Sequence, residues 1–179
     1  MQLRKVEVIP YQREWILLYK EEKQRILKIM EPDQIVIHHI GSTSVHGLSA
    51  KPIIDILAEV NDIKIIDLLT PELVQVGYSS KGENSIKGRR FFIKSNEIGE
   101  RLYHLHAFQK GSPEINRHLV FRDYLRMHPK EAQRYAKIKE TAAKKFPFDI
   151  EAYMDFKNPI IKELEQEAKN WSNKREESR

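Results

Sequence analysis

Residues 39–55 read HIGSTSVHGLSAKPIID and carry the pattern that decides the fold. The β-branched run at residues 34–40 ends at Gly41, which indicates a strand that stops at a turn. Three hydroxyl residues follow the glycine, and residues 53–60 are then almost continuously apolar. A run of that kind is typical of a strand inside a sheet, so the stretch predicts strand, turn and strand.

The turn has the composition of a phosphate-binding site. Gly41 lets the backbone approach a ligand closely, and Lys51 would add a positive charge. Several short-range donors come from backbone N–H groups and from the hydroxyl groups of Ser42, Thr43 and Ser44. The turn is not a Walker A loop, because Gly47 is followed by Leu48 rather than by a lysine.

Asp55 lies in an apolar run, between Ile54 and Ile56. A buried carboxylate is costly unless it is paired, hydrogen-bonded or bound to a metal ion. The position therefore predicts a functional carboxylate. The alternative is a structural one that caps the turn or pairs with Lys51.

The rest of the chain predicts a mixed sheet followed by helices, and thus an α+β fold. Residues 89–94 and 101–108 flank a loop that contains Gly99, as in a hairpin. We expect one domain at residues 1–170, with the sheet in 1–110 and helices in 112–170. The other predicted elements are a strand at 6–9, a helix ending at Met30, a break at 31–33, a short helix at 63–69, a segment at 71–78 that continues this helix or leads into a strand, helices at 112–128, 130–145 and 149–170, and a fraying polar tail at 171–179.

Composition limits the class of protein. The chain has 179 residues and no cysteine, which excludes disulfides and thiolate metal sites. No run of about 18 apolar residues is present, so we expect a cytoplasmic protein. Residues 1–84 carry 10 basic and 12 acidic side chains, whereas residues 85–179 carry 21 and 14. This asymmetry suits a polyanionic ligand between the halves, although a basic surface in a lysine-rich protein is the simpler interpretation.

The stretch at residues 39–56 closely resembles the GrpB family, which belongs to the nucleotidyltransferase superfamily with the DNA polymerase β-like fold. The resemblance covers most of the chain, and its motifs are specific. Outside the stretch it rests on Tyr11, Trp15, His104-Leu105-His106, Arg117-His118-Leu119, residues 121–126, His128-Pro129, Tyr153 and Lys157.

The resemblance implies that Gly41 and Ser42 hold the phosphates of a nucleotide and that Asp55 is a catalytic metal ligand. In the superfamily a second carboxylate follows two residues later, and a third comes from a neighbouring strand. Here Leu57 occupies the second position. Glu59 faces the same side of the strand, but its Cα lies about 13 Å from that of Asp55, too far to share a metal ion without a bulge.

His104 and His106 are candidate substitutes, because alternate residues of a strand face the same side. With Asp55 they predict a site for one divalent metal ion, Mg or Mn from the superfamily, or Zn, which imidazole ligands favour. The alternative is a hydrogen-bonded histidine pair without metal. Arg90 and Arg117 are the basic residues expected to neutralise a triphosphate, unless they are surface charges or helix ion pairs.

Three functions follow from this pattern. The leading hypothesis is transfer of a nucleotidyl group from a nucleoside triphosphate to an acceptor that the sequence does not reveal. Leu57 motivates the second, a nucleotide-binding module without catalysis. The basic C-terminal half motivates the third, a nucleic-acid-binding domain. The preferred base and the oligomeric state are not encoded in any motif that we recognise.

Overall fold

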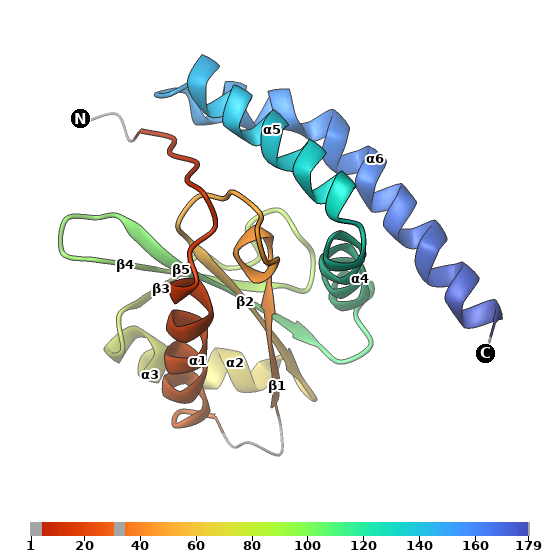
Figure 1. The fold of residues 1–179 in the computed structure, drawn as a ribbon. Helices are drawn as coiled ribbons and strands as arrows, with labels where there is room; N and C mark the ends of the chain where they lie inside the picture. The colour runs from red at the N-terminus through yellow and green to blue at the C-terminus, as the bar shows by residue number, and fades with distance from the viewer. Residues whose placement is uncertain (1–4, 31–34, 179) are drawn as a thin grey trace.

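The computed structural model describes residues 5–30 and 35–178 (Figure 1). Within these residues, one five-stranded sheet has the order β1-β2-β5-β4-β3. The β2–β5 pair is parallel and the other three pairs are antiparallel, so the sheet is mixed as predicted. The strands are β1 (Ile35–Ile40), β2 (Ile54–Val60), β3 (Tyr78–Ser80), β4 (Arg90–Ser95) and β5 (Arg101–Gln109).

Helices lie on both faces of the sheet, which confirms the α+β class. Three early helices pack on one face, namely α1 (Glu14–Leu27), α2 (Lys64–Leu68) and α3 (Thr70–Gln75). The other three follow the sheet in the chain, namely α4 (Pro113–Met127), α5 (Pro129–Lys145) and α6 (Ile150–Glu177). In the part of the chain that is described, no helix is both long and apolar enough to cross a bilayer.

Strand alternation separates the main core from the opposite face. Ile54 and Ile56 point into the core beneath α1, α2 and α3, and both are almost fully buried. Successive strand residues point to opposite faces, so Asp55 and Leu57 point the other way. We call that other surface of the sheet, with Asp55, Leu57, His104 and His106, the site face.

Helix α4 covers only part of the site face, where Ile115 packs on Leu57 and Phe108. The helix begins where the sequence predicted, with the Ser112 side chain accepting a hydrogen bond from the backbone N–H of Glu114 at 3.4 Å. Helices α5 and α6 run side by side and both contact α4 (Figure 1). Their hydrophobic contacts reach the segment after β1 through Val45 and Leu48.

Polar contacts hold α1 and α4 on the sheet. Glu22 of α1 is fully buried and accepts hydrogen bonds from Tyr78 at 3.0 Å and Lys94 at 2.8 Å. Backbone carbonyls of the edge strand β1 accept hydrogen bonds from Tyr19 of α1 and Arg122 of α4. These donors occupy acceptors that an edge strand would otherwise expose.

One predicted strand and two predicted helix ends are wrong, and one prediction lies outside the described residues. The first helix ends at Leu27 rather than at Met30. Residues 6–9 form no strand, because the backbone N–H of Val6 bonds to Pro147 while Ile9 forms a single bridge to Ala50. The last helix does not end at residue 170 but continues to Glu177. Trp171 packs against Tyr124 and His128 there, which ties the last turns to α4. The predicted break at 31–33 falls outside the described residues.

Candidate functional site

The turn after β1 lies directly against Asp55. Gly41 has φ +70° and ψ −175°, a conformation that is almost restricted to glycine. A Cβ atom at Gly41 would lie 2.6 Å from Oδ2 of Asp55, so a side chain here would collide with the carboxylate. Ile40 is the strand partner of Asp55, which explains the close approach.

The three hydroxyl residues of the turn differ in their contacts. Thr43 and Ser44 are buried, and their hydroxyl groups contact His39 and the Gly41 carbonyl at 3.0 and 2.6 Å. Both therefore hold the turn together. The hydroxyl oxygen of Ser42 instead accepts a hydrogen bond from the Nζ atom of Lys139 in α5, at 2.8 Å.

Asp55, His104 and His106 converge, as the sequence predicted. Oδ1 of Asp55 lies 3.2 Å from Nδ1 of His104 and 3.4 Å from Nε2 of His106. One potential ligand atom from each of the three residues lies within 4.8 Å of the others. The Asp55 side chain is 29% exposed, because α4 leaves this part of the site face open.

Hydrogen bonding decides the protonation of Asp55. Burial favours the neutral acid and so raises the pKa, but hydrogen bonds from His104 and His106 outweigh it and hold the pKa of Asp55 below its ordinary value. Burial also lowers the pKa of His106, against the opposing effect of Asp55. The site therefore has a carboxylate that stays ionised beside an imidazole that is neutral near pH 7.

No carboxylate occupies position 57, where the resemblance implies a second one. Leu57 is fully buried in an apolar cluster with Ile40, Phe108 and Ile115. Glu59 lies further along β2, and its carboxylate is 3.8 Å from the imidazole of His38. The described residues thus fit one cation with a carboxylate and imidazole nitrogens, but they do not fit a pair of cations between two carboxylates.

Three lysines converge on the Ser42 side of the turn. The Nζ atom of Lys139 is hydrogen-bonded to Ser42 and, at 2.5 Å, to the carbonyl oxygen of Ser49, and the residue is 3% exposed. Lys51 and Lys157 each place Nζ 5.2 Å from the centre of the Tyr153 ring, which lies in α6. Lys51, Lys139 and Lys157 are called the lysine cluster below.

The lysine cluster is electrostatically strained. Burial, followed by repulsion from Lys157 and Lys51, holds the pKa of Lys139 well below its ordinary value. Burial and Lys51 lower the pKa of Lys157 to about 8, although Asp55 opposes the shift. Among the described residues, neither Lys139 nor Lys157 forms an ion pair with a carboxylate. An anion bound here would relieve the repulsion.

Sequence reasoning missed Lys139 as a site residue, and it used Lys157 only as one of the residues that carry the family resemblance. A signal for Lys139 did exist. Lys139 lies at helical spacing from the buried Ala132, Tyr135 and Ala142 of α5. A charged residue therefore lies on the buried face of an amphipathic helix. A lysine on such a face needs a special environment.

Arg90 and Arg117 are engaged elsewhere. Arg90 binds the carboxylate of Asp67 through two nitrogens, at 2.6 and 2.9 Å. Arg117 is paired with Glu114 and with Glu165 of α6. Their predicted contact with phosphates stays a prediction, and the structure does not bring them to the turn.

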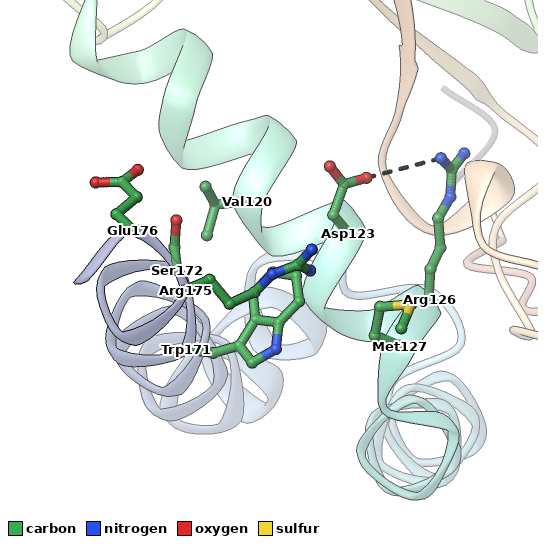
Figure 2. A pocket seen from close by; sticks show the side chains of 8 residues that line it. All are labelled: Val120, Asp123, Arg126, Met127, Trp171, Ser172, Arg175 and Glu176. Carbon is green, nitrogen blue, oxygen red and sulfur yellow. Dashed lines mark ion pairs between the residues drawn. The ribbon is translucent and has the colours of Figure 1, made fainter. Parts of the chain in front are cut away.

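A separate groove of about 370 Å³ lies between α4 and the end of α6 (Figure 2). Val120, Met127 and Trp171 supply its apolar lining, and Arg126 at its edge is 3.7 Å from Asp123. The lining of this groove includes neither Asp55, His104 and His106 nor any lysine of the lysine cluster. The candidate site is therefore not in this groove.

Comparison with known proteins assigns the family. The model of the GrpB protein family matches residues 5–167. The chain belongs to the GrpB family. Among relatives, the UPF0157 protein YqkA of Bacillus subtilis (strain 168) is 45% identical over 168 residues, which are 94% of this chain and 48% of YqkA. This GrpB-family chain thus spans about half the length of that relative.

Solved structures agree with this assignment. The crystal structure of conserved protein GrpB from Enterococcus faecalis is 40% identical, covers 92% of this chain and 99% of its own, and superposes with a TM-score of 0.86. A structure of Cid1 poly(U) polymerase with Mg 3′-dATP bound is 11% identical, with a TM-score of 0.54 over 76% of this chain and 43% of that chain. The latter likeness shows the fold alone. The GrpB-family chain therefore has the polymerase β-like nucleotidyltransferase fold that the sequence predicted.

Proposed function

We propose that this protein binds a nucleoside triphosphate, with the phosphates between the Gly41-Ser42 turn and the lysine cluster. The observation that carries the proposal is the hydrogen bond from Lys139 to the Ser42 hydroxyl group, with Lys51 and Lys157 near enough to Lys139 to lower its pKa. Lys139 and Lys157 form no ion pair with a carboxylate among the described residues, and the burial that lowers both pKa values makes their positive charges costly in the free protein. A polyphosphate supplies the missing negative charge, and the turn supplies further donors.

The proposal includes one divalent cation at the Asp55 carboxylate, with imidazole and phosphate ligands. Asp55 stays ionised, and the nearby nitrogens of His104 and His106 suit Mn²⁺ or Zn²⁺ better than Mg²⁺. When bound, such a cation would polarise the phosphoryl group under attack. The lysine cluster takes over part of the charge neutralisation that a second cation would provide.

The reaction that fits this arrangement is nucleotidyl transfer. A hydroxyl oxygen of the acceptor bonds to the α-phosphorus, and the bond from that phosphorus to the α–β bridging oxygen breaks. Pyrophosphate leaves with the bonding electrons and stays against the lysine cluster, while the hydroxyl proton passes to water. Cid1 supports the proposal through the shared fold, because its structure contains Mg 3′-dATP.

A binding module without catalysis is the second candidate, and the burial of Leu57 favours it. Two-cation transfer clamps the attacking and leaving oxygens between two ions, and Leu57 removes the ligand for one of them. Such a module would bind the same nucleotide at the same place. The two candidates differ in whether pyrophosphate is released.

Binding is tested by thermal unfolding and calorimetry with ATP, UTP, GTP and CTP, with and without Mn²⁺. Ligand binding to the folded state raises the melting temperature. Lys139→Met and Lys157→Met are expected to weaken binding about tenfold each, since each removes a charged hydrogen-bond donor. Lys137→Met is the matched control and should bind as the parent does, because Lys137 is an exposed lysine on the same helix as Lys139.

The outcomes separate the candidates. If no nucleotide at millimolar concentration shifts the melting temperature, both are rejected. Binding with pyrophosphate release that is lost in Asp55→Asn supports transfer. Binding without any release supports the module, and release that persists in Asp55→Asn removes Asp55 from the mechanism.

A further inference from the structure

Arg89, which the sequence did not single out, is buried beside the candidate cation site. The residue is 5% exposed, and its guanidinium group lies over the Phe91 ring at 4.6 Å. The group donates to the carbonyl oxygens of Glu83 at 3.1 Å and Asn84 at 2.6 Å. Its position is therefore set from several directions.

The loop before β4 has a strained backbone next to Arg89. Asn84 and Ser85 have φ values of +44° and +70°, which residues with side chains adopt at a cost. The strained backbone turns the carbonyl groups of residues 83 and 84 toward Arg89. The loop thus holds a guanidinium group against the site face.

The remaining contact of Arg89 determines the tautomer of His106. One terminal nitrogen of Arg89 lies 3.3 Å from Nδ1 of His106. A guanidinium group only donates hydrogen bonds, so Nδ1 must accept and carries no proton. The neutral imidazole then has its proton on Nε2, which donates to Oδ1 of Asp55 at 3.4 Å.

His104 differs from His106 on this point. Its Nδ1 atom faces the same Asp55 oxygen at 3.2 Å, but its Nε2 atom has no hydrogen-bond partner among the described residues. In the free protein the ionised Asp55 carboxylate can only accept, so a neutral His104 carries its proton on Nδ1, but no donor faces Nε2 to oppose a move of the proton to that atom. A nitrogen that binds a metal ion must present a lone pair, and its partner nitrogen then carries the proton. His104 can meet that condition, whereas His106 would point an N–H group at Arg89.

We infer that Arg89 is a positioning residue that keeps His106 as an N–H donor to Asp55 and so excludes it from the cation. The protein ligands of the proposed cation then narrow from three to two, Asp55 and His104. Two ligands hold a divalent cation weakly, so most of the remaining ligands come from the nucleotide phosphates. The cation consequently enters with the nucleotide. This inference rests on the cation site of the proposed function.

The tautomer is measured by ¹⁵N NMR of the histidine side chains in the free protein near pH 7.5. The signals of His106 are assigned as the set that is missing from the spectrum of the His106→Gln variant. The expected pattern is an unprotonated Nδ1 and a protonated Nε2. A protonated Nδ1 in the wild-type protein would overturn the inference, and this measurement depends on neither nucleotide nor cation.

A matched pair of variants tests the effect on the cation, with Zn²⁺ alone as the probe. Arg89→Lys keeps an obligate donor, whereas the amide oxygen of Arg89→Gln can accept a hydrogen bond from Nδ1–H and so leave the lone pair of Nε2 for the ion. We expect Arg89→Gln to bind Zn²⁺ about tenfold more tightly than the wild type, and Arg89→Lys to show no gain. The gain should vanish in the Arg89→Gln, His106→Ala double variant.

Two results would contradict the inference. One is that Zn²⁺ shifts the His106 Nε2 signal of the wild-type protein as much as it shifts the signals of His104. The other is an equal Zn²⁺ affinity of Arg89→Gln and Arg89→Lys when both retain the wild-type circular dichroism. A failure of all nucleotides to bind would reject the proposed function but would leave the tautomer result intact.

Discussion

At the residue scale, Gly41 couples the turn to the carboxylate of Asp55. The absence of a side chain lets the backbone lie against Oδ2, and the positive φ brings the chain into the turn. Gly47 also has a positive φ, +77°, but a Cβ atom there would meet nothing within 4 Å. A side chain at Gly47 therefore meets only the cost of the backbone conformation, whereas a side chain at Gly41 meets such a cost and the collision as well.

Gly41→Ala should lower the free energy of unfolding more than Gly47→Ala does. The positive φ alone costs an alanine about 1–2 kcal/mol, which we expect for Gly47→Ala. Gly41→Ala adds a displacement of Asp55 and should also weaken nucleotide binding. Urea unfolding and calorimetry measure both effects, and equal losses in the two variants would contradict the role given to Gly41.

At the element scale, β2 and α4 decide what the site face can do. The strand places residues 55 and 57 on one face, but α4 covers only the second of them. Asp55 stays open to ligands, whereas Leu57 belongs to the apolar contact that fixes α4 to the sheet. At the position of the missing carboxylate, Leu57 therefore contributes to the packing of α4 on the sheet.

Leu57→Asp is not expected to restore a two-cation site. A carboxylate there would be buried among Ile40, Phe108 and Ile115, and the variant should lose about 3–5 kcal/mol of stability. Leu57→Met keeps the volume and should lose less than about 1.5 kcal/mol. Urea unfolding and Mn²⁺ titration test this prediction, and a stable Leu57→Asp variant that binds Mn²⁺ more tightly would refute it.

Helix α6 shows how packing decides where an element ends. Ser172 and Asn173 are poor helix formers and would favour an end of the helix there, yet the helix continues to Glu177. The Trp171 ring lies 5.9 Å from the ring of Tyr124, and Arg175 lies over the indole at 4.7 Å. These contacts compensate for the entropy of ordering the last turns.

Trp171→Ala should unfold the end of α6 without unfolding the protein. Amide hydrogen exchange at residues 171–177 is expected to approach that of an open chain, while β2 and β5 keep their protection. Trp171→Phe retains an aromatic ring and should preserve most of the protection. Unchanged exchange in Trp171→Ala would show that another contact holds these turns.

At the scale of the whole molecule, the lysine cluster depends on the docking of α5 and α6 against the turn. Its three members come from the loop after the turn and from two helices, and Lys139 is 97 residues from Ser42 in the chain. The free protein carries their repulsion as an unfavourable contribution to stability. The same repulsion favours the binding of an anion, because an anion would offset the positive charges.

The stability of the protein should therefore rise with pH above about 8. The folded-state pKa of Lys157 is about 8, below its ordinary value of 10.5, so the unfolded chain binds more protons between these values. The unfavourable contribution is full below pH 8 and is relieved as the pH approaches 10. Relative to Lys157→Met, the wild-type protein should gain about 1–2 kcal/mol across this window. Urea unfolding at pH 7, 8.5 and 10 measures the gap between the two proteins, and a gap that does not change with pH would contradict the prediction.

Much of the fold follows from residues that are close together in the sequence. The β-branched run before Gly41 and the apolar run around Asp55 are strands, and the hairpin of β4 and β5 lies where residues 89–108 predicted it. Strand alternation also predicted that His104 and His106 face the same side of their strand. Such patterns depend on backbone geometry, which a local sequence carries within itself.

The sequence by itself thus determined the strand-turn-strand unit, the family and the missing carboxylate at Leu57. Only the tertiary structure decided that Leu57 is packed beneath α4, that Lys139 contacts Ser42 and lies near Lys157, and that Arg89 faces His106. The physical reason is that the charge, tautomer and solvent exposure of a side chain depend on its neighbours in space. Those neighbours come from segments that only the packing of helices on the sheet brings together.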